Sequence, residues 1–357
     1  LKAMNIKIKT LALFSLAIVF LTSCNETNEA SHSPRYTKSL NDDWLFKLGD
    51  NSAYSEASYN TDSWRKLDVP HDWSVEGRYD TIHGTDWQTG FLPAGIGWYK
   101  KEMYLEEDPK THTIELQFDG VYMNSTVWVN DKLIGTQHYG YTTFFYDISD
   151  YLEKGKNTIA VRVDNSKPNS ARWFTGAGIY RNVWLRIMPK AYFKTNEQFV
   201  KTSFVNDNSV SLHTLAEFVN KEDVELKGTH IQKIFSPDLE LLNTEKEEFV
   251  LSSNDNVVFN RNINLQQPEL WSLENPRRHL VVNQVVDENE QLIDTDTTYF
   301  GIKKTEFSPE WGFKLNDENI KIKGVCIHQD AGLYGVAVPE SILLYRLKLL
   351  KEMGVNA

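Results

Sequence analysis

Short stretches of alternating apolar and polar residues dominate the chain from residue 40 onward. Trp44, Phe46 and Leu48 alternate with polar neighbours, as expected of a strand with one buried face. Similar stretches follow, separated by turn residues, at 98–104, 113–118, 125–129, 133–135 and 157–163. Many short strands with turns between them favour a mostly β fold, namely a β-sandwich or jelly roll.

A second set of strands follows Pro189-Lys190-Ala191, which we interpret as a domain boundary. Residues 210–218 alternate well, and residues 280–287 and 297–301 close the region. About a hundred residues without a helical pattern predict a smaller immunoglobulin-like β-sandwich.

The pattern changes after Phe307. Residues 312–315 and 320–322 flank an expected hairpin turn at 316–319, and residues 323–328 predict another strand. A helix is expected next, with Pro339 at its first position, Gly354 at its end and an apolar stripe at helical spacing. The stripe consists of Leu343, Leu344, Leu347, Leu350 and Met353.

Residues 355–357 are expected to begin a further strand. One strand-loop-helix unit cannot bury its own apolar faces, and a (β/α)8 barrel needs eight such units and about 250 residues. We therefore expect the chain to end inside a third domain.

The N-terminus has the pattern of a targeting segment. Lys2, Lys7 and Lys9 precede an apolar run at 11–21 that is short for a membrane span. The sequence LTSC at residues 21–24 resembles a bacterial lipobox, in which Cys24 receives the lipid. We expect residues 1–24 to be a lipoprotein signal peptide, with a plain secretory signal or a short anchor as alternatives. Residues 25–37 predict a flexible tether.

An exported lipoprotein would lie in the periplasm or at the cell surface, held to the membrane through Cys24. A net charge of −11 without a basic block argues against nucleic acid as a partner. With Cys24 lipidated, Cys326 is the one remaining thiol, so no intrachain disulfide is expected. We predict that Cys326 is a small buried strand residue rather than a nucleophile.

Ten Trp and sixteen Tyr residues suit either sugar-binding surfaces or the cores of β-sandwiches. The nine His residues show no pair at metal-ligand spacing, so no zinc site is proposed.

Residues 176–185 (GAGIYRNVWL) combine a glycine turn with an expected strand at 179–185. Arg181 in the middle of this strand needs a partner if it is buried, and the pattern alone predicts a bulged strand with one ion pair.

Several motifs together resemble glycoside hydrolase family 2, the family of β-galactosidases, β-glucuronidases and β-mannosidases. They are VPHDW at 69–73, GIGWYKK at 95–101, FDGVY at 118–122, Gly140-Tyr141 with Phe144, AVRVDN at 160–165, GIYRNVWL at 178–185, KGVCIHQD at 323–330 and LLKEMGVNA at 349–357. The resemblance implies a jelly-roll sugar-binding domain at 38–189, an immunoglobulin-like sandwich at 190–302 and the start of a TIM-barrel catalytic domain at 303–357. The GAGIYR and HDW forms favour the β-galactosidase branch, with β-glucuronidase as the alternative.

The resemblance also implies a retaining mechanism, in which one Glu is the acid and a second Glu, about 5 Å away, is the nucleophile. Both lie on later barrel strands in the family, so we expect no catalytic residue in this chain and no activity from it alone. The Asn-Glu pairs at 25–26, 28–29, 196–197 and 289–290 are interpreted as surface positions.

The implied partner is an oligosaccharide or polysaccharide, and oligomerisation stays open. No cofactor can be identified, although the family implies magnesium or sodium in a full-length enzyme. A non-catalytic carbohydrate-binding fragment and the product of a split gene are the alternatives.

Two candidate substrate-binding residues lie at and just after the end of the expected first barrel strand. His328 lies at its C-terminal end, where barrel active sites form, and the resemblance places it in the glycone subsite. The alternative is a histidine bonded to nearby backbone. Asp330, two residues later, could accept two sugar hydroxyls.

Arg172, Trp173 and Asp164 are the other candidates. Some family β-galactosidases have an Asp near the position of Arg172 that reaches the sugar and a sodium ion, so Arg172 puts that sodium site in doubt. Arg172 could bond a sugar hydroxyl or carboxylate, or form an ion pair that holds the loop. Asp164 is either a subsite residue or, as we favour, the partner of an Arg such as Arg181.

Overall fold

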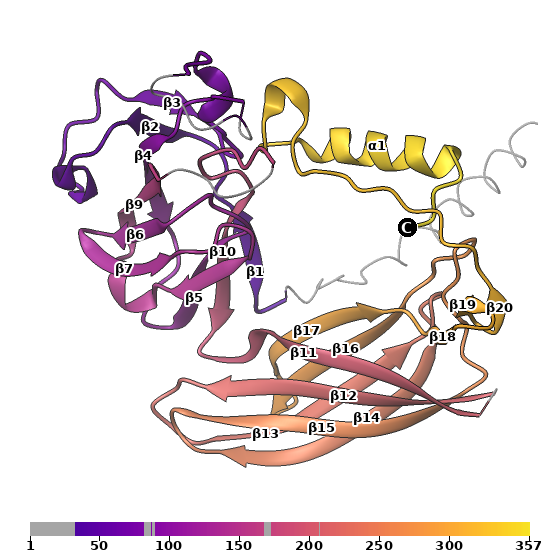
Figure 1. The fold of residues 1–357 in the computed structure, drawn as a ribbon. Coiled ribbons are helices and arrows are strands. Elements are labelled where there is room, and N and C mark those ends of the chain that lie inside the picture. The colour runs from indigo at the N-terminus through magenta and orange to yellow at the C-terminus, as the bar shows by residue number, and fades with distance from the viewer. Residues whose placement is uncertain (1–32, 82–86, 88–89, 168–172, 207) are drawn as a thin grey trace, which may run out of the picture. The chain divides into compact units, whose positions relative to one another are not determined.

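Two β-sandwiches follow each other along the chain in the structure, a computed structural model that describes residues 33–81, 87, 90–167, 173–206 and 208–357 (Figure 1). Residues Pro34–Ala357 form one compact unit. The expected signal peptide, including Cys24, lies outside the described residues, as does Arg172.

The first sandwich pairs a six-stranded sheet, in the order β3-β2-β4-β9-β6-β7, with a four-stranded sheet, β1-β10-β5-β8. Its strands are β1 (Tyr36–Ser39), β2 (Trp44–Leu48), β3 (Arg65–Leu67), β4 (Gly95–Leu105), β5 (His112–Phe118), β6 (Ser125–Val129), β7 (Lys132–Gln137), β8 (Phe144–Asp147), β9 (Gly155–Asn165) and β10 (Val183–Pro189). The strands expected at 98–104, 113–118, 125–129 and 157–163 are therefore confirmed.

Inward-facing residues of both sheets fill one apolar core between them. Trp44 and Phe46 of β2 are buried with Phe118 of β5 and Leu185 of β10. Leu48 was expected to share this core, but it is 53% exposed at the end of β2.

The last strand of the first sandwich begins later than expected, at Val183 rather than at residue 179. The residues before it pair with loops instead of a strand. The carbonyl oxygens of Ile179 and Ala177 accept the N–H groups of His71 (2.7 Å) and Trp73 (3.1 Å), and Gly178 forms a bridge to Tyr122.

The second sandwich pairs a three-stranded sheet, β11-β12-β15, with a four-stranded sheet, β14-β13-β16-β17. Its strands are β11 (Ala191–Asn206), β12 (Ser209–Asn220), β13 (Leu226–Phe235), β14 (Leu241–Leu251), β15 (Asp255–Gln266), β16 (His279–Asp287) and β17 (Leu292–Phe300). The strands expected at 210–218 and 280–287 lie within β12 and β16.

Polar side chains occur inside the second sandwich beside its apolar clusters. His230 is fully buried, its ring stacks on Phe259 at 3.9 Å, and its Nε2 lies 3.1 Å from Oδ1 of Asn283. Burial lowers the pKa of His230 to about 3, so the ring is neutral.

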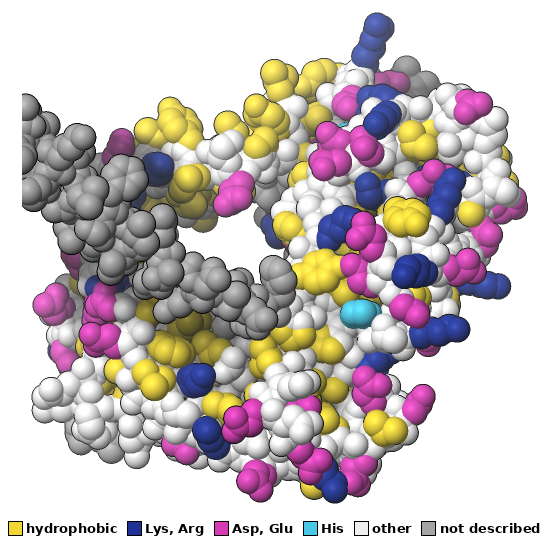
Figure 2. Space-filling view, turned by 180° about the vertical axis from the view of Figure 1, so that it is seen from behind, with side chains coloured by type: hydrophobic (Ala, Val, Ile, Leu, Met, Phe, Trp, Pro, Cys, Tyr) yellow, Lys and Arg dark blue, Asp and Glu magenta, His cyan; other side chains and the backbone are white. Residues whose placement is uncertain are grey.

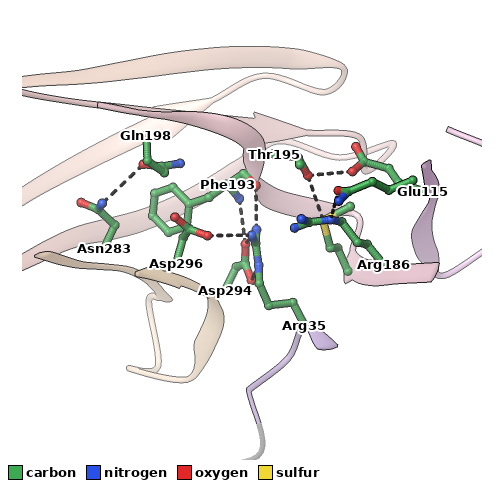
Figure 3. A network of polar contacts seen from close by, with 11 residues as sticks. Arg35, Glu115, Arg186, Phe193, Thr195, Gln198, Asn283, Asp294 and Asp296 are labelled. Carbon is green, nitrogen blue, oxygen red and sulfur yellow. Dashed lines mark hydrogen bonds and ion pairs between the residues drawn. The ribbon is translucent and has the colours of Figure 1, made fainter. Parts of the chain in front are cut away.

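Hydrogen bonds and ion pairs link the two sandwiches (Figure 3). Arg35, just before β1, donates to Asp294 of β17 (Nε to Oδ1, 2.8 Å), to Asp296 (3.1 Å) and to the carbonyl oxygen of Phe193 in β11. The hydroxyl of Thr195 donates to Glu115 at 2.7 Å.

A small sheet of β18 (Thr305–Ser308), β19 (Gly312–Leu315) and β20 (Glu318–Asn319) follows the second sandwich. Its turn is tighter than expected. Asn316 and Asp317 have φ of 50° and 68°, as in a two-residue hairpin, and residues 318–319 already belong to the strand.

The strand expected at 323–328 is not formed as a regular strand. Its first residues run beside the chain end, where Val325 N–H donates to Ala357 (3.1 Å) and Asn356 N–H donates to Lys323 (3.0 Å). Cys326 is exposed, so its expected burial is wrong, because its segment packs against little of the described chain.

The expected helix is α1 (Glu340–Glu352), with Pro339 as its N-cap residue rather than its first helical residue. Gly354 follows its end with φ of 84°. The predicted stripe is largely exposed, with Leu343 at 40%, Leu347 at 57% and Met353 at 76%, and Figure 2 shows hydrophobic side chains gathered over this helix. Among the described residues, no helix has the length and apolar character needed to cross a membrane.

Candidate functional site

Three segments that are far apart in the sequence meet at one end of the first sandwich. They are the loop at 71–77, the segment at 173–180 before β10, and the loop at 328–337 before α1. Hydrogen bonds join each of them to at least one other.

Trp173 is the most exposed large side chain in the middle segment, at 38%. Its indole N–H donates to the hydroxyl of Tyr141 at 3.1 Å, which fixes the orientation of the ring. The ring of His328 stands edge-on to it, with 6.1 Å between the centroids and 63° between the planes. The structure thus brings two of the predicted site residues together.

The hydroxyl of Tyr141 connects the two loops that carry these residues. Gln329 donates from its side-chain amide to the Tyr141 hydroxyl and to the carbonyl oxygen of Phe174, both at 3.4 Å. Burial raises the pKa of Tyr141 to about 12, so its hydroxyl keeps its proton at neutral pH. Tyr122 and Tyr139 pack on the Tyr141 ring at 5.2 and 5.7 Å.

This arrangement suits recognition of a sugar. The indole face of Trp173 offers a flat apolar surface, and the imidazole of His328 offers one nitrogen as a donor and one as an acceptor. His328 is exposed, and its ring is therefore accessible to a ligand.

The other predicted residues take different positions. Asp330 is half-buried, and its carbonyl oxygen accepts from Arg346 of α1 at 2.8 Å. The carboxylate of Asp164 accepts from Ser166 and from Arg162 at 3.2 Å, which supports the end of β9. Burial is the largest single influence on the pKa of Asp164 and acts to raise it. The hydrogen bonds from Ser166 and the charge of Arg162 together outweigh burial, so the pKa of Asp164 is lowered.

Asp164 is paired with an arginine, as we favoured, but its partner is Arg162 and not Arg181. The guanidinium of Arg181 lies over the ring of Tyr180 at 5.4 Å, and the side chain is exposed. Since Arg181 precedes the ladder of β10 and faces solvent, it needs no ion pair.

Asp72 joins all three segments, and sequence reasoning did not identify it as a site residue. Its Oδ1 accepts the backbone N–H groups of Ser74 and Ala177, and its Oδ2 accepts that of Val336, each at 3.0 Å. Burial raises the pKa of Asp72 to about 6, while the three N–H donors oppose the rise. The neighbouring His71 is also buried, with Nδ1 2.7 Å from the Tyr99 hydroxyl.

The sequence contained a partial signal for these additional residues. Asp72 and Tyr141 both belong to motifs that carried the family resemblance. Their roles depend on partners far along the chain, because Val336 lies 264 positions after Asp72 and Gln329 lies 188 after Tyr141.

The structure holds no candidate metal centre in its described part, where His, Cys, Asp and Glu residues form no group of three or more suited to a metal ion. Glu197 and Glu290, from two of the Asn-Glu pairs, are exposed as expected. The other two pairs lie outside the described residues.

Two family models match the chain. The model described as glycosyl hydrolases family 2, sugar binding domain, matches residues 37–189, and the model described as glycosyl hydrolases family 2 matches residues 194–303.

Two curated relatives are each 35% identical to the chain. The β-galactosidase of Bacteroides ovatus aligns over 325 residues, 91% of this chain and 38% of the relative. A putative β-glucuronidase of Formosa agariphila aligns over 356 residues, 99% of this chain and 33% of the relative.

Solved structures have the same fold over most of the chain. A β-glycosidase from Bacteroides vulgatus superimposes with a TM-score of 0.82 at 37% identity, covering 90% of this chain and 41% of that one. A Bacteroides uniformis β-glucuronidase 2, covalently bound to cyclophellitol-6-carboxylate aziridine, gives a TM-score of 0.84 at 28% identity, with coverages of 90% and 39%. The chain thus spans well under half the length of these four proteins.

Proposed function

The chain belongs to glycoside hydrolase family 2, and we propose that it is the N-terminal part of an exported, retaining β-glycosidase of the β-galactosidase type. Such an enzyme removes terminal β-linked sugars from oligosaccharides or polysaccharides. The whole-protein activity is proposed for a longer protein, because the relatives extend far beyond the aligned region.

The observation that carries this proposal is the contact between Trp173 and His328. These residues come from the segment before β10 and the loop before α1, and both are accessible. Trp173 would stack on one face of a sugar ring, while His328 and Asp330 would bond its hydroxyls. Arg172, which adjoins Trp173 in the sequence, is a further candidate to bind the same ligand.

The catalytic step is proposed for carboxylates outside this chain. Retention requires a nucleophile and an acid about 5 Å apart, and a covalent glycosyl intermediate. The covalent complex of the Bacteroides uniformis β-glucuronidase supports such a nucleophile in that relative.

A barrel is the proposed setting of residues 303–357. The bonds of Lys323 and Val325 to the chain end run between two parallel segments, and α1 lies between these segments in sequence. This is the connection that a βα-barrel repeats around its circumference. The exposed apolar stripe of α1 fits a helix that packs on further barrel elements.

Two sugar specificities, for β-galactosides and for β-glucuronides, are candidates for the longer enzyme. The Bacteroides ovatus relative is a β-galactosidase, whereas the Formosa agariphila and Bacteroides uniformis proteins are β-glucuronidases or putative ones. A glucuronide carries a carboxylate that Arg172 could bind, and β-glucuronidase is therefore the second candidate.

The test compares nitrophenyl β-galactoside and nitrophenyl β-glucuronide as substrates of the longer protein encoded in frame. We expect higher kcat/KM for the galactoside, and no turnover by residues 1–357 alone. A preference for the glucuronide would favour the second candidate. Turnover by the isolated chain would contradict the proposal that the catalytic carboxylates lie downstream.

Export through lipidation of Cys24 is also part of the proposal, and it rests on the LTSC sequence. Metabolic labelling with a fatty-acid analogue should mark the wild-type protein and not the Cys24→Ser variant. Equal labelling of both would contradict it.

A further inference from the structure

The buried carboxylate of Asp72 accepts backbone N–H groups from both of the loops proposed to bind sugar. We propose that Asp72 is a positioning residue, which sets the placement of the Trp173 segment against the loop that carries His328 and Asp330. We call the set of hydrogen bonds from Ser74, Ala177 and Val336 to the Asp72 carboxylate the joint. The link between the joint and sugar binding rests on the proposed function, whereas the joint itself does not.

Three backbone N–H groups from three segments share this carboxylate. Ser74 belongs to the same loop as Asp72, Ala177 follows Trp173, and Val336 ends the loop that begins at His328. Asp72 is only 3% exposed, and no salt bridge between described residues includes it. The carboxylate oxygens therefore hold backbone N–H groups in place, rather than forming an ion pair or bonding solvent.

Two glycines allow the backbone to approach this carboxylate. At Gly335, with φ of 54°, an added Cβ would lie 2.2 Å from Oδ2 of Asp72. At Gly176, with φ of 65°, it would lie 2.6 Å from the same oxygen and 2.2 Å from Val336. Glycine at these two positions is therefore what lets both segments come close to the Asp72 carboxylate.

Other contacts make the loop at 328–337 respond as a unit. Ala331 N–H donates to Gly335 at 2.9 Å and closes the loop, and Arg346 fixes Asp330 from the side of α1. A shift at Val336 would consequently be transmitted towards His328. Asp72 does not act as an acid or base in this proposal, because it is enclosed and does not contact the exposed ring of His328.

An amide cannot replace the carboxylate here. In the Asp72→Asn variant, the side chain would present an oxygen on one side and an NH2 group on the other, so at least one backbone N–H would face a donor. The substitution is therefore nearly isosteric and still breaks the joint.

Gly335→Ala breaks the same joint from the opposite side and leaves the carboxylate intact. Gly332→Ala is its matched control. Gly332 lies in the same loop with φ of 51°, but an added Cβ would meet nothing within 4 Å. Both glycines have positive φ, so both substitutions place a side chain on strained backbone, and only at Gly335 would the added Cβ reach Asp72.

The first measurement is amide hydrogen exchange of residues 1–357, followed by mass spectrometry. We expect exchange at 174–178 and 330–337 to rise at least about tenfold in D72N and G335A, with β4 and β9 still protected. G332A should match the wild type in both joint segments. Wild-type exchange in D72N and G335A, or equal effects of G335A and G332A, would overturn the joint.

The second measurement separates positioning from stability in the longer enzyme. A variant that only folds less well loses kcat and keeps its KM, since KM does not depend on the amount of folded enzyme. We expect D72N and G335A to raise KM for nitrophenyl β-galactoside about tenfold, and G332A to leave it unchanged.

An unchanged KM alongside raised loop exchange would overturn the positioning role and keep the joint. A wild-type enzyme without any glycosidase turnover would instead refute the proposed function, and the exchange result would still stand.

Discussion

Asp72 and Asp294 are both buried carboxylates that hold distant segments together, yet they do so by different chemistry. Asp294 binds the guanidinium of Arg35 and the backbone N–H of Phe193 (2.7 Å), and it links the two sandwiches. Among the described residues, the hydrogen-bond partners of the Asp72 carboxylate are backbone N–H groups, and it links the loops of the candidate site.

The two sets of contacts should therefore respond differently when one partner is removed. A buried ion pair leaves a bare charge when one partner is removed, so its loss affects the stability of the whole unit. A carboxylate held by neutral donors has no partner charge to lose. Its loss frees the local backbone. Burial raises the pKa of both carboxylates, that of Asp72 to about 6, so the contrast lies in the partners and not in the direction of the pKa shift.

The largest expected effect is at the ion pair. Arg35→Ala leaves the fully buried Asp294 without its cation, and we expect the free energy of unfolding to fall by about 3–5 kcal/mol. Urea unfolding at neutral pH measures it. A loss below about 1 kcal/mol would remove the contrast between the two joints.

The pH dependence of stability should isolate Asp72. Its pKa is raised from 3.8 to about 6 on folding, so the folded state binds the proton more tightly than the unfolded state. The free energy of unfolding of the wild type, relative to D72N, should therefore fall by about 3 kcal/mol as the pH rises from about 4 to 6, and stay level above that range.

Urea titrations of wild type and D72N at several pH values provide this comparison. Other buried carboxylates remain in both proteins, and their contributions cancel in the difference. Parallel curves for the two proteins would contradict a raised pKa at Asp72.

A smaller effect is expected from a neutral donor at the junction of the sandwiches. Thr195→Val removes the hydroxyl that bonds Glu115, whose own pKa burial raises. The predicted loss is about 1–3 kcal/mol, below that of Arg35→Ala. A loss as large as that of Arg35→Ala would show that charge is not what distinguishes the ionic joint.

The smallest effect belongs to an exposed ion pair, which serves as the control for charge removal. Lys66 pairs with Asp43 at 2.7 Å, and both side chains are about two-thirds exposed, at 67% and 66%. Lys66→Ala should leave the unfolding free energy within experimental error, because solvent screens such pairs. A clear destabilisation would mean that burial does not set the ranking.

Most strands of the first sandwich and some of the second could be predicted from alternation, because each sheet has one face against a core. Residues 125–129, for example, coincide with β6. Predictions failed where a neighbour outside the local pattern decided the outcome. Strand β10 begins at Val183 and not at residue 179, because residues 177–179 pair with the 71–73 loop. Cys326 is exposed because its segment has few packing partners.

The candidate site shows the same limit. Residue type and motif position singled out Trp173 and His328, and the structure places their rings together. The joint at Asp72 could not be inferred in that way, since its function depends on contacts with Ala177 and Val336 that no local spacing encodes.

In the proposed enzyme, this chain supplies sugar-binding loops, while the reacting carboxylates lie beyond it. Covalent labelling with a galactose-configured cyclophellitol aziridine, mapped by peptide mass spectrometry, tests this division of labour. We predict an adduct on a glutamate downstream of Ala357 in the longer enzyme, and none on residues 1–357 expressed alone. An adduct on any carboxylate within residues 33–357 would contradict it.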